Sequence, residues 1–368
     1  MKLALSSLIF ILLSFSCSCS PRVFEKAQMT DTSGNEALQL GLFEGEEILD
    51  LTLSGPIRTL FNDRDDDPEY HPMEISYQAT DGTTVSIPLK VKTRGNFRRN
   101  KANCTYPPLL LNFAKATTPK TSLFNKQDKL KLVTPCRDQS YVINEYLVYK
   151  LYNLITEKSF RGRLVRVVYA DTEKGKDMEP LYGMILEDED QMAERNNAEI
   201  VKKNKVRPNK TNREVFLKMA VFEYMIGNTD WSVQYRHNVK LLNTDSDILL
   251  ATVPYDFDHA GIVRAPYAKP APELQMSSVR ERRYRGYCIE DMSEFDSVFA
   301  LFNELKDDFY RVYTECPLLD QKYIKNTIKF LDDFYKTINN PKAVAKAFSY
   351  PCDERGTGNV IIQGLRGN

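Results

Sequence analysis

Apolar and polar residues alternate along much of the first half of the chain. Directly after an Asp81-Gly82 turn, apolar side chains occupy every second position of residues 85–91. A two-residue period after such a turn is typical of a half-buried strand that leaves a hairpin. Further strands are expected at residues 48–53, 74–78, 109–113, 129–133, 164–169 and 181–187. The pattern predicts a β-rich amino-terminal region.

Apolar residues recur at helical spacing in other parts of the chain. Between Ile143 and Ile155 this spacing predicts an amphipathic helix. A strongly apolar helix is expected at residues 215–226, where Gly227 supplies a good carboxyl-terminal cap. Residues 294–347 have the same helical character. The second half of the chain is therefore expected to be mainly helical.

The remaining segments complete the expected layout. Two short strands are predicted at residues 238–242 and 248–253, and the charged residues 188–213 are expected to form an exposed connection. We therefore predict an α+β fold with two lobes. The lobes are a β-rich N-lobe at residues 37–187 and a mainly helical C-lobe at residues 188–352.

The charge balance narrows the functional classes. The 368 residues carry 50 basic and 50 acidic side chains. A general nucleic-acid binder or a polybasic membrane-surface protein needs a net positive field, so both classes are disfavoured. We expect no nucleic-acid partner.

The amino terminus differs from the rest of the chain. Lys2 precedes an apolar run at residues 3–15, which is typical of a secretory signal peptide. Cys17 and Cys19 follow it and suggest a bacterial lipoprotein signal over residues 1–19; cleavage without lipidation and an uncleaved anchor are the alternatives. We expect an exported protein, lipid-anchored in the cell envelope and touching the membrane through that anchor only.

Both ends of the predicted folded region are expected to be loose. Residues 20–36 are polar and predict a flexible tether, and residues 353–368 form a glycine-rich tail.

Five cysteines follow the tether, and none forms a C-x-x-C pair, which leaves zinc and thioredoxin-type motifs without support. Cys104 and Cys136 lie in the same predicted lobe and are the first candidates for a disulfide, as expected for an exported protein. The alternative is that all five are buried and unpaired. Because the count is odd, at least one thiol stays free. The chain has 3 histidines, which excludes a histidine-rich metal site.

The densest group of chemically capable residues lies between Gly227 and Gly261. Asp230 follows a helix end, Asn238 begins a strand, and an Asp256-Phe257-Asp258 sequence follows the next hairpin. Phosphoryl transfer needs hard oxygen ligands for magnesium and a separate carboxylate that faces the nucleophile. Asn238 and Asp256, with or without Asp258, are candidates for the ligands, and Asp230 for the base. A purely structural network is the alternative.

Several segments resemble the spore-coat CotH kinase family in the same order, and resemble still more an uncharacterised branch of exported Bacteroidetes proteins. The similar segments, which lie within residues 50–340, are residues 93–98, 129–133, 137–141, 182–187 and the regions around Asp230 and Asp256. The resemblance implies an atypical protein-kinase-like fold that binds ATP and Mg²⁺ and phosphorylates protein hydroxyl groups of serine or threonine.

The resemblance also implies roles in nucleotide binding. By position, Lys131 would hold the α and β phosphates, Glu145 would be its ion-pair partner, Glu187 would lie at the hinge between the lobes, and Arg94 would contact phosphates. Three of them have a plainer alternative: Lys131 as a solvated strand lysine, Glu187 as a strand-end carboxylate, and Arg94 as part of a solvated hairpin end.

The chain departs from the kinase pattern in three ways. It has no G-x-G-x-x-G loop, Asn238 lies eight positions after Asp230 where kinases use five, and Asp258 replaces the glycine of D-F-G. The alternative function is a non-catalytic envelope lipoprotein with a pseudokinase-like scaffold, used for binding or assembly. A metal-dependent hydrolase ranks last, because it usually recruits histidines.

One basic segment remains outside these assignments. Arg280, Arg282, Arg283 and Arg285 alternate with tyrosines after a proline-rich bend. The segment could receive an acidic or phosphorylated partner; a single-stranded nucleic-acid groove and a solvated loop are the alternatives.

Overall fold

The structure is a computed structural model, which describes residues 41–114, 118–202, 205–244 and 247–349. The predicted signal peptide, tether and carboxyl-terminal tail lie outside the described residues. The described residues belong to one unit, Gln39–Asn368.

Seven strands form a ring. They are β1 (Leu49–Gly55), β2 (His71–Gln78), β3 (Thr84–Thr93), β4 (Leu109–Phe113), β5 (Lys129–Val133), β6 (Gly162–Asp171) and β8 (Leu181–Leu186). Their order is β1-β2-β3-β4-β5-β8-β6, and β6 pairs back to β1. The β1–β6 pair is parallel and the other pairs are antiparallel, so the sheet is a closed mixed barrel. The two-residue strand β7 (Lys176–Asp177) pairs with the end of β6.

The prediction of a two-lobed protein-kinase-like fold is wrong, because the strands close into a barrel that helices follow. The closure of the barrel pairs Leu49 with Val165 and Leu53 with Tyr169. In each pair, the two residues are separated by more than half of the sequence that forms the barrel. Alternation of apolar residues predicts that a segment is a strand, but not which distant strand it pairs with. The individual strands were therefore predictable and the barrel was not.

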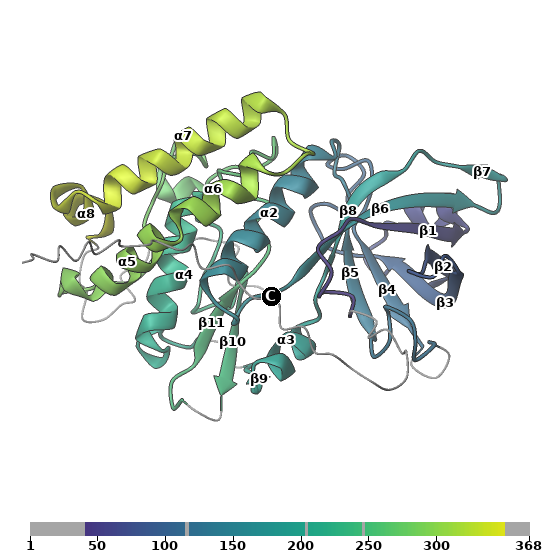
Figure 1. Ribbon diagram of the computed structural model, residues 1–368, viewed down its shortest axis with the longest axis horizontal. Helices are drawn as coiled ribbons and strands as arrows, with labels where there is room; N and C mark the ends of the chain where they lie inside the picture. Colours follow the sequence, from purple (N-terminus) through teal and green to yellow (C-terminus); the bar gives the residue numbers. More distant parts are fainter. Residues whose placement is uncertain (1–40, 115–117, 203–204, 245–246, 350–368) are drawn as a thin grey trace, which may run out of the picture. The chain divides into compact units, whose positions relative to one another are not determined.

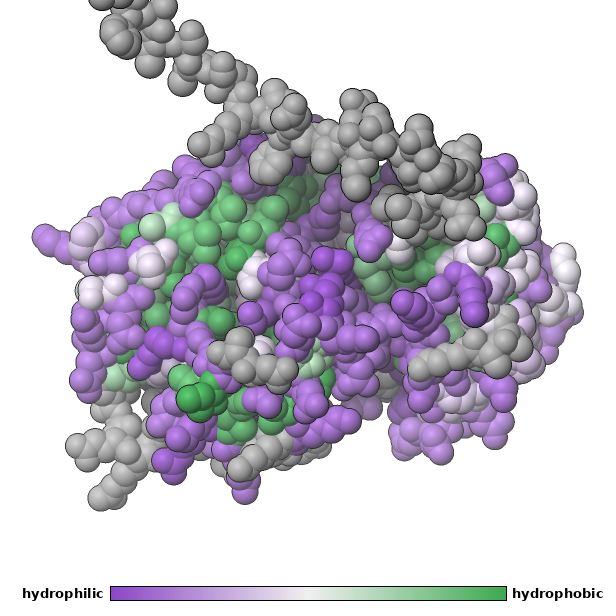
Figure 2. Space-filling view, turned by 60° about the horizontal axis from the view of Figure 1, so that its bottom comes forward, coloured by the Kyte–Doolittle hydropathy of each residue, from purple (hydrophilic) through white to green (hydrophobic). Residues whose placement is uncertain are grey.

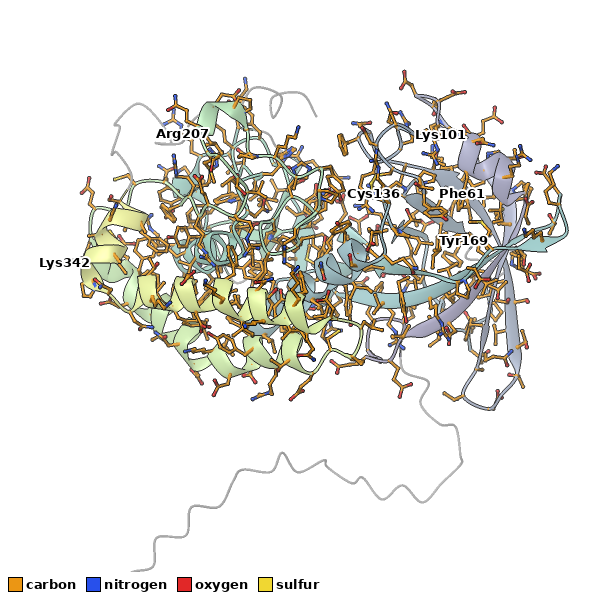
Figure 3. All side chains as sticks on the ribbon, turned by 90° about the horizontal axis from the view of Figure 1, so that it is seen from above. Phe61, Lys101, Cys136, Tyr169, Arg207 and Lys342 are labelled. Carbon is orange, nitrogen blue, oxygen red and sulfur yellow. A yellow bond between two sulfur atoms is a disulfide. The ribbon has the colours of Figure 1, made fainter. Side chains whose placement is uncertain are left out.

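The inside of the barrel holds a core of its own. Inward side chains of all seven strands pack together, and helix α1 (Ile57–Asn62) adds Ile57 and Leu60. Phe61 of α1 lies against Tyr169 of β6, with ring centroids 5.2 Å apart (Figure 3). Helix α1 has six residues, too few to show a helical period, so the sequence did not reveal it.

Part of the barrel's outer face is also buried. Helix α2 (Ser140–Ile155) packs against β6 and β8. Met184 and Leu186 of β8 join the core around α2, whereas Ile185 points into the barrel core. Lys131 lies between inward-facing Leu130 and Leu132 of β5, so its side chain is on the outer face, towards the helical part.

The helical part contains α4 (Arg213–Ile226), α5 (Asp296–Glu304), α6 (Lys306–Thr314), α7 (Gln321–Ile338) and α8 (Pro341–Phe348). A three-stranded sheet of β9 (Ala198–Ile200), β10 (Val239–Thr244) and β11 (Ala251–Pro254) has the order β11-β10-β9. Three short 3₁₀ helices lie at Pro208–Lys210, Pro272–Leu274 and Met292–Phe295. In Figure 1 the barrel is on the right, α4 to α8 are on the left, and α2 lies between them.

Residues 188–213 are more ordered than predicted. They contain helix α3 (Glu189–Arg195) and strand β9. Asp188 caps α3 by accepting a hydrogen bond from the Asp190 backbone N–H, and α3 has acidic residues in its first turn and Arg195 in its last. These charges complement the helix dipole, so residues 189–195 form a helix instead of a plain connection.

The face of the molecule shown in Figure 2 is mainly hydrophilic, with several hydrophobic patches among the polar residues. Within the described ranges, no helix is long and apolar enough to cross a membrane.

The predicted Cys104–Cys136 disulfide is confirmed, Cys288 is also disulfide-bonded, and Cys316 is a free thiol.

Candidate functional site

The β10–β11 hairpin brings Asn238 and Asp256 together. Val239 pairs with Pro254 at the open end of the hairpin, and the Tyr255 N–H donates to the Asn238 carbonyl at 3.0 Å. Asn238 and Asp256 both have left-handed backbone conformations, with φ of 52° and 63°. Asparagine and aspartate adopt this conformation more easily than other residues with a Cβ. The Asp256 N–H donates to the Tyr149 hydroxyl of α2 at 2.8 Å, which fixes this turn to the helix.

Asp230 is held on the loop between α4 and β10. Gly227 ends α4 with φ of 70°, and the Asp230 N–H donates to Asn228 Oδ1 at 3.0 Å. His237 Nε2 lies 3.1 Å from Asp230 Oδ1. The Asn238 amide donates to the Asp230 carbonyl at 2.8 Å and to Oδ2 at 3.3 Å. The two residues that the sequence paired are therefore in direct contact.

The charge of Asp230 is stabilised. Burial acts to raise its pKa, but the hydrogen bond and charge of His237, with the charges of His259 and Arg285, bring the net pKa below its ordinary value. Asp230 is thus a carboxylate at neutral pH. Because a carboxylate of low pKa is a weak base, this environment suits orientation of a hydroxyl group better than full proton removal.

Asp256 has a different environment. Its side chain is exposed to solvent, yet protein surrounds it closely enough that burial and the charge of Asp258 raise its pKa to about 6, against the opposing effect of Arg94 and Arg98. In the part of the chain that the structure describes, its carboxylate has no hydrogen-bond or ion-pair partner. A solvent-open carboxylate without a partner is suited to bind a cation.

Two cations of the barrel region lie near Asp256. The charge of Asp256 acts on both Arg94, which directly follows β3, and Lys131 of β5. Burial lowers the pKa of each, and for Lys131 the charges of Arg94 and Lys240 lower it further. Lys131 Nζ lies 5.6 Å from the centre of the Tyr255 ring. Among the described residues, neither Arg94 nor Lys131 forms an ion pair through its side chain.

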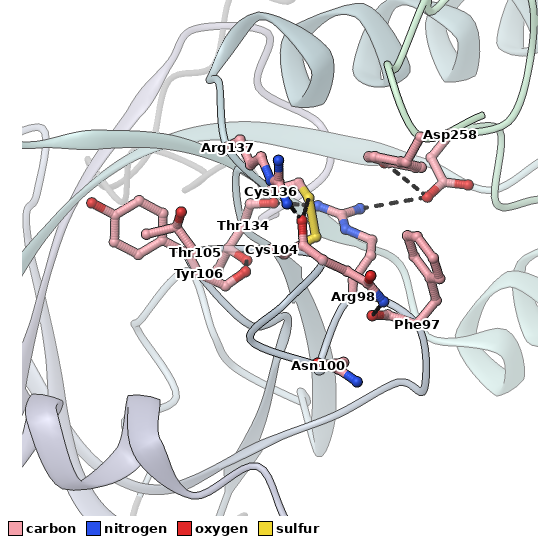
Figure 4. The surroundings of a disulfide bond; sticks show 12 residues. Phe97, Arg98, Asn100, Cys104, Thr105, Tyr106, Thr134, Cys136, Arg137 and Asp258 are labelled. Atoms are coloured by element: carbon pink, nitrogen blue, oxygen red, sulfur yellow. Dashed lines mark hydrogen bonds and ion pairs between the residues drawn. A yellow bond between two sulfur atoms is a disulfide. The ribbon is translucent and has the colours of Figure 1, made fainter.

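The predicted ion-pair partner of Lys131 is engaged elsewhere. Glu145 of α2 lies 3.7 Å from Arg98. Arg98 also lies 4.0 Å from Asp258, as Figure 4 shows. Burial and the charge of Asp258 raise the pKa of Glu145 well above its ordinary value. The Tyr267 hydroxyl donates to Asp258 at 3.0 Å. Asp258 therefore belongs to a network behind Asp256.

Glu187 is not brought together with these residues. Its two carboxylate oxygens lie 3.0 and 2.9 Å from Arg195, and Oε2 also accepts from the Arg161 N–H at 2.9 Å. These bonds join the end of β8 to α3, and both oxygens are occupied.

The oxygen donors that could hold Mg²⁺ are few. Over the described ranges, no group of three or more His, Cys, Asp or Glu side chains is arranged to hold a metal. Mg²⁺ commonly uses only one or two carboxylates and completes its coordination with water and substrate phosphates. Asp256 fits this use, and the Asn238 amide oxygen could be a second donor on the hairpin, because the amide nitrogen is the atom that bonds to Asp230.

Two site residues were missed in the sequence. His237 lies in the same loop as Asp230, and Lys240 of β10 is two positions after Asn238. Lys240 pairs with Glu189 of α3 and lies 5.1 Å from the centre of the Tyr255 ring. Its closeness to Asn238 along the chain was the signal that would have found it.

The fold and the site together define a closed mixed barrel, followed by helices, with a charged site where barrel strands face the β10–β11 hairpin. Among solved structures, the chain is similar to a Helicobacter pylori proinflammatory kinase, CtkA, with a TM-score of 0.39 and 12% identity over 70% of this chain and 94% of that chain. No protein-family model and no curated protein matches the chain. Its function has to be inferred from its own side chains.

Proposed function

We propose that the protein is an ATP-dependent phosphotransferase of CotH-like activity, which uses Mg²⁺ to transfer the γ-phosphoryl group to a serine or threonine hydroxyl of a protein. One observation carries the proposal: Arg94 and Lys131 lie close enough to Asp256 for its charge to act on both, and none of the three has a direct ion-pair partner in the described part of the chain. Two cations and one solvent-open carboxylate match a group of phosphates with a bound divalent cation.

The cations divide the phosphate contacts between them. The Arg94 guanidinium has a planar fork of donors that suits two phosphate oxygens, whereas Lys131 provides a compact charge. Asp256 and Asn238 would hold Mg²⁺, with Asp258 behind them. The bound cation would neutralise charge on the phosphates.

Asp230 would orient the accepting hydroxyl group. Asn238 holds it from one side and His237 from the other, so its position relative to Asp256 is set by the hairpin. Its lowered pKa keeps it able to accept a hydrogen bond from a hydroxyl throughout the neutral range.

The partner and the compartment are proposed from the sequence. The apolar run at residues 3–15 and the cysteines that follow it support an exported protein with a lipid anchor in the cell envelope. The accepting protein would then be one that this compartment contains.

The test compares ATP binding and turnover by purified protein with and without Mg²⁺. Lys131→Met should weaken ATP binding at least tenfold, whereas Lys129→Met, an exposed lysine of the same strand, should not. Asp256→Ala should remove the Mg²⁺ dependence. If no nucleotide raises the melting temperature of the wild type, the phosphotransferase proposal fails.

A non-catalytic envelope protein is the second candidate. It is favoured by the pairing of Glu145 with Arg98 instead of Lys131. Binding of a divalent cation without any binding of nucleotide would support this candidate.

A further inference from the structure

A second charged pocket lies outside the candidate site. Its volume is about 300 Å³, and it is lined by Arg264, Arg280, Asn326, Lys329, Phe330 and Asp333. The arginines come from the segment that follows Asp258, and the other four residues from α7. None of these residues belongs to the candidate phosphotransfer site.

Both arginines lie over aromatic rings of α7. Arg280 donates to the Gly261 carbonyl at 3.0 Å and lies 4.4 Å from the centre of the Phe330 ring. Arg264 lies 6.0 Å from the centre of the Tyr323 ring. The backbone of Arg264 has φ of 64°, a strained conformation for a residue with a long side chain. Arg280 is thus held by a hydrogen bond, and the exposed Arg264 lies near enough for its charge to act on Arg280.

The charges of the pocket do not cancel. Burial lowers the pKa of Arg280, and the charge of Arg264 lowers it further. Asp333 is the one acidic residue of the lining, and it pairs with Lys336 at 3.0 Å. Within the described ranges, Arg264, Arg280 and Lys329 form no ion pair. Like charges held together in this way repel one another, and a bound anion would offset the free energy of this repulsion.

We propose that this pocket binds a phosphate monoester. A dianionic phosphate suits three cationic groups better than a single carboxylate does, because it carries nearly two charges and three accepting oxygens. The guanidinium groups of Arg264 and Arg280 can each donate to two of these oxygens. Asn326 adds an amide donor at the wall. The phosphate can be part of a phosphorylated protein side chain or of a small free molecule.

Calorimetric titration tests the proposal with three probes: inorganic phosphate, O-phosphoserine, and a phosphoserine peptide with its unphosphorylated counterpart. Titrations use the Lys131→Met variant as well as the wild type, so that binding at the candidate site is separated. The Arg264→Gln and Lys329→Gln double variant should weaken binding at least tenfold in both backgrounds. Both side chains are exposed, so the fold should be preserved. Arg283→Gln, an exposed arginine outside the pocket, is the control.

The outcomes are distinct. Tighter binding of the phosphopeptide than of free phosphate supports a phosphorylated protein as the source, and equal binding supports a small phosphate compound. Binding that survives the double variant, or the failure of every phosphate probe to bind, overturns the proposal. Loss of ATP binding in Lys131→Met does not affect this result, because the two sites share no residue.

Discussion

The carboxyl group of Glu223 is buried in α4, close to the loop that carries Asp230. Burial raises its pKa well above the ordinary value of 4.5, and Asn228 opposes the shift, although neither carboxyl oxygen has a well-formed hydrogen bond within the described structure. A raised pKa in the folded state means that the protonated form favours folding. Glu223 therefore contributes stability below pH 4.5, and this contribution is lost as the pH rises through its folded-state pKa.

Replacing Glu223 with glutamine should remove this pH dependence. Glu223→Gln and the wild type should have similar melting temperatures near pH 4, and the variant should be more stable by a few degrees at pH 8. Thermal unfolding across this range measures the difference. Glu214→Gln, an exposed residue of the same helix, is the control and should show no such gain at pH 8. A constant difference at every pH would contradict the assignment.

The role proposed for Asp230 predicts a loss of rate without a loss of nucleotide binding. Asp230→Asn keeps the shape of the side chain but removes the charge that would orient the accepting hydroxyl, so kcat should fall by about 10²–10⁴. The KM for ATP should change little, since Arg94 and Lys131 would hold the phosphates. Steady-state kinetics with a protein substrate separates the two parameters. A large rise in KM at unchanged kcat would place Asp230 in nucleotide binding instead.

At the residue scale, the sequence indicated the candidates that lie close along the chain. Asp230, Asn238 and Asp256 belong to one helix–loop–hairpin unit, so their spacing already placed them near one another. Glu145 and Glu187 could not be assigned in this way. In the sequence, a carboxylate that will bind a ligand looks the same as one that will pair with an arginine. The partners of Glu145 and Glu187 are Arg98 and Arg195, and only the fold brings the segments that carry them together.

At the scale of elements, a disulfide and hydrogen bonds link the loop after β3 to the residues that directly follow β5. The Cys104–Cys136 disulfide joins them, the Thr105 N–H donates to the Cys136 carbonyl at 2.7 Å, and Arg98 donates to the Thr134 carbonyl (Figure 4). The same loop begins with Arg94. The disulfide therefore holds a candidate phosphate ligand against the strand that carries Lys131.

Loss of the disulfide should affect both stability and nucleotide binding. The double variant Cys104→Ser and Cys136→Ser should lose about 2–4 kcal/mol of unfolding free energy. It should also raise the KM for ATP, because the position of Arg94 is less constrained. Cys316→Ser, which removes a free thiol, is the matched control. Unchanged ATP binding in the destabilised double variant would show that the loop does not need this link to position Arg94.

Element boundaries were predictable where periodicity lasted long enough. Strands β4 and β5 were predicted to the residue, and α2 and α4 within a few residues. Helices α1 and α3 were missed because each has fewer than two full turns, and charge made α3 look like a connection.

At the scale of the whole molecule, the barrel core and the helical core share strands. In β8, Ile185 points into the barrel and Leu186 packs in the helical core. The sequence showed β8 only as an apolar run, and this double burial explains why it does not alternate. The closure of the barrel by β1 and β6 could not be predicted from the sequence, since pairing between distant strands leaves no local pattern.

Shared strands predict that barrel and helices unfold together. Trp231, the one tryptophan of the chain, is buried in the helical core, whereas Leu111 is buried inside the barrel. Leu111→Ala should cost about 2–5 kcal/mol through the lost burial and the cavity it leaves. If the cores are coupled through β5, β6 and β8, the unfolding midpoint seen by Trp231 fluorescence should fall by the same amount as that seen by circular dichroism. A Trp231 transition that stays at the wild-type midpoint would instead show that the barrel and the helical part unfold independently.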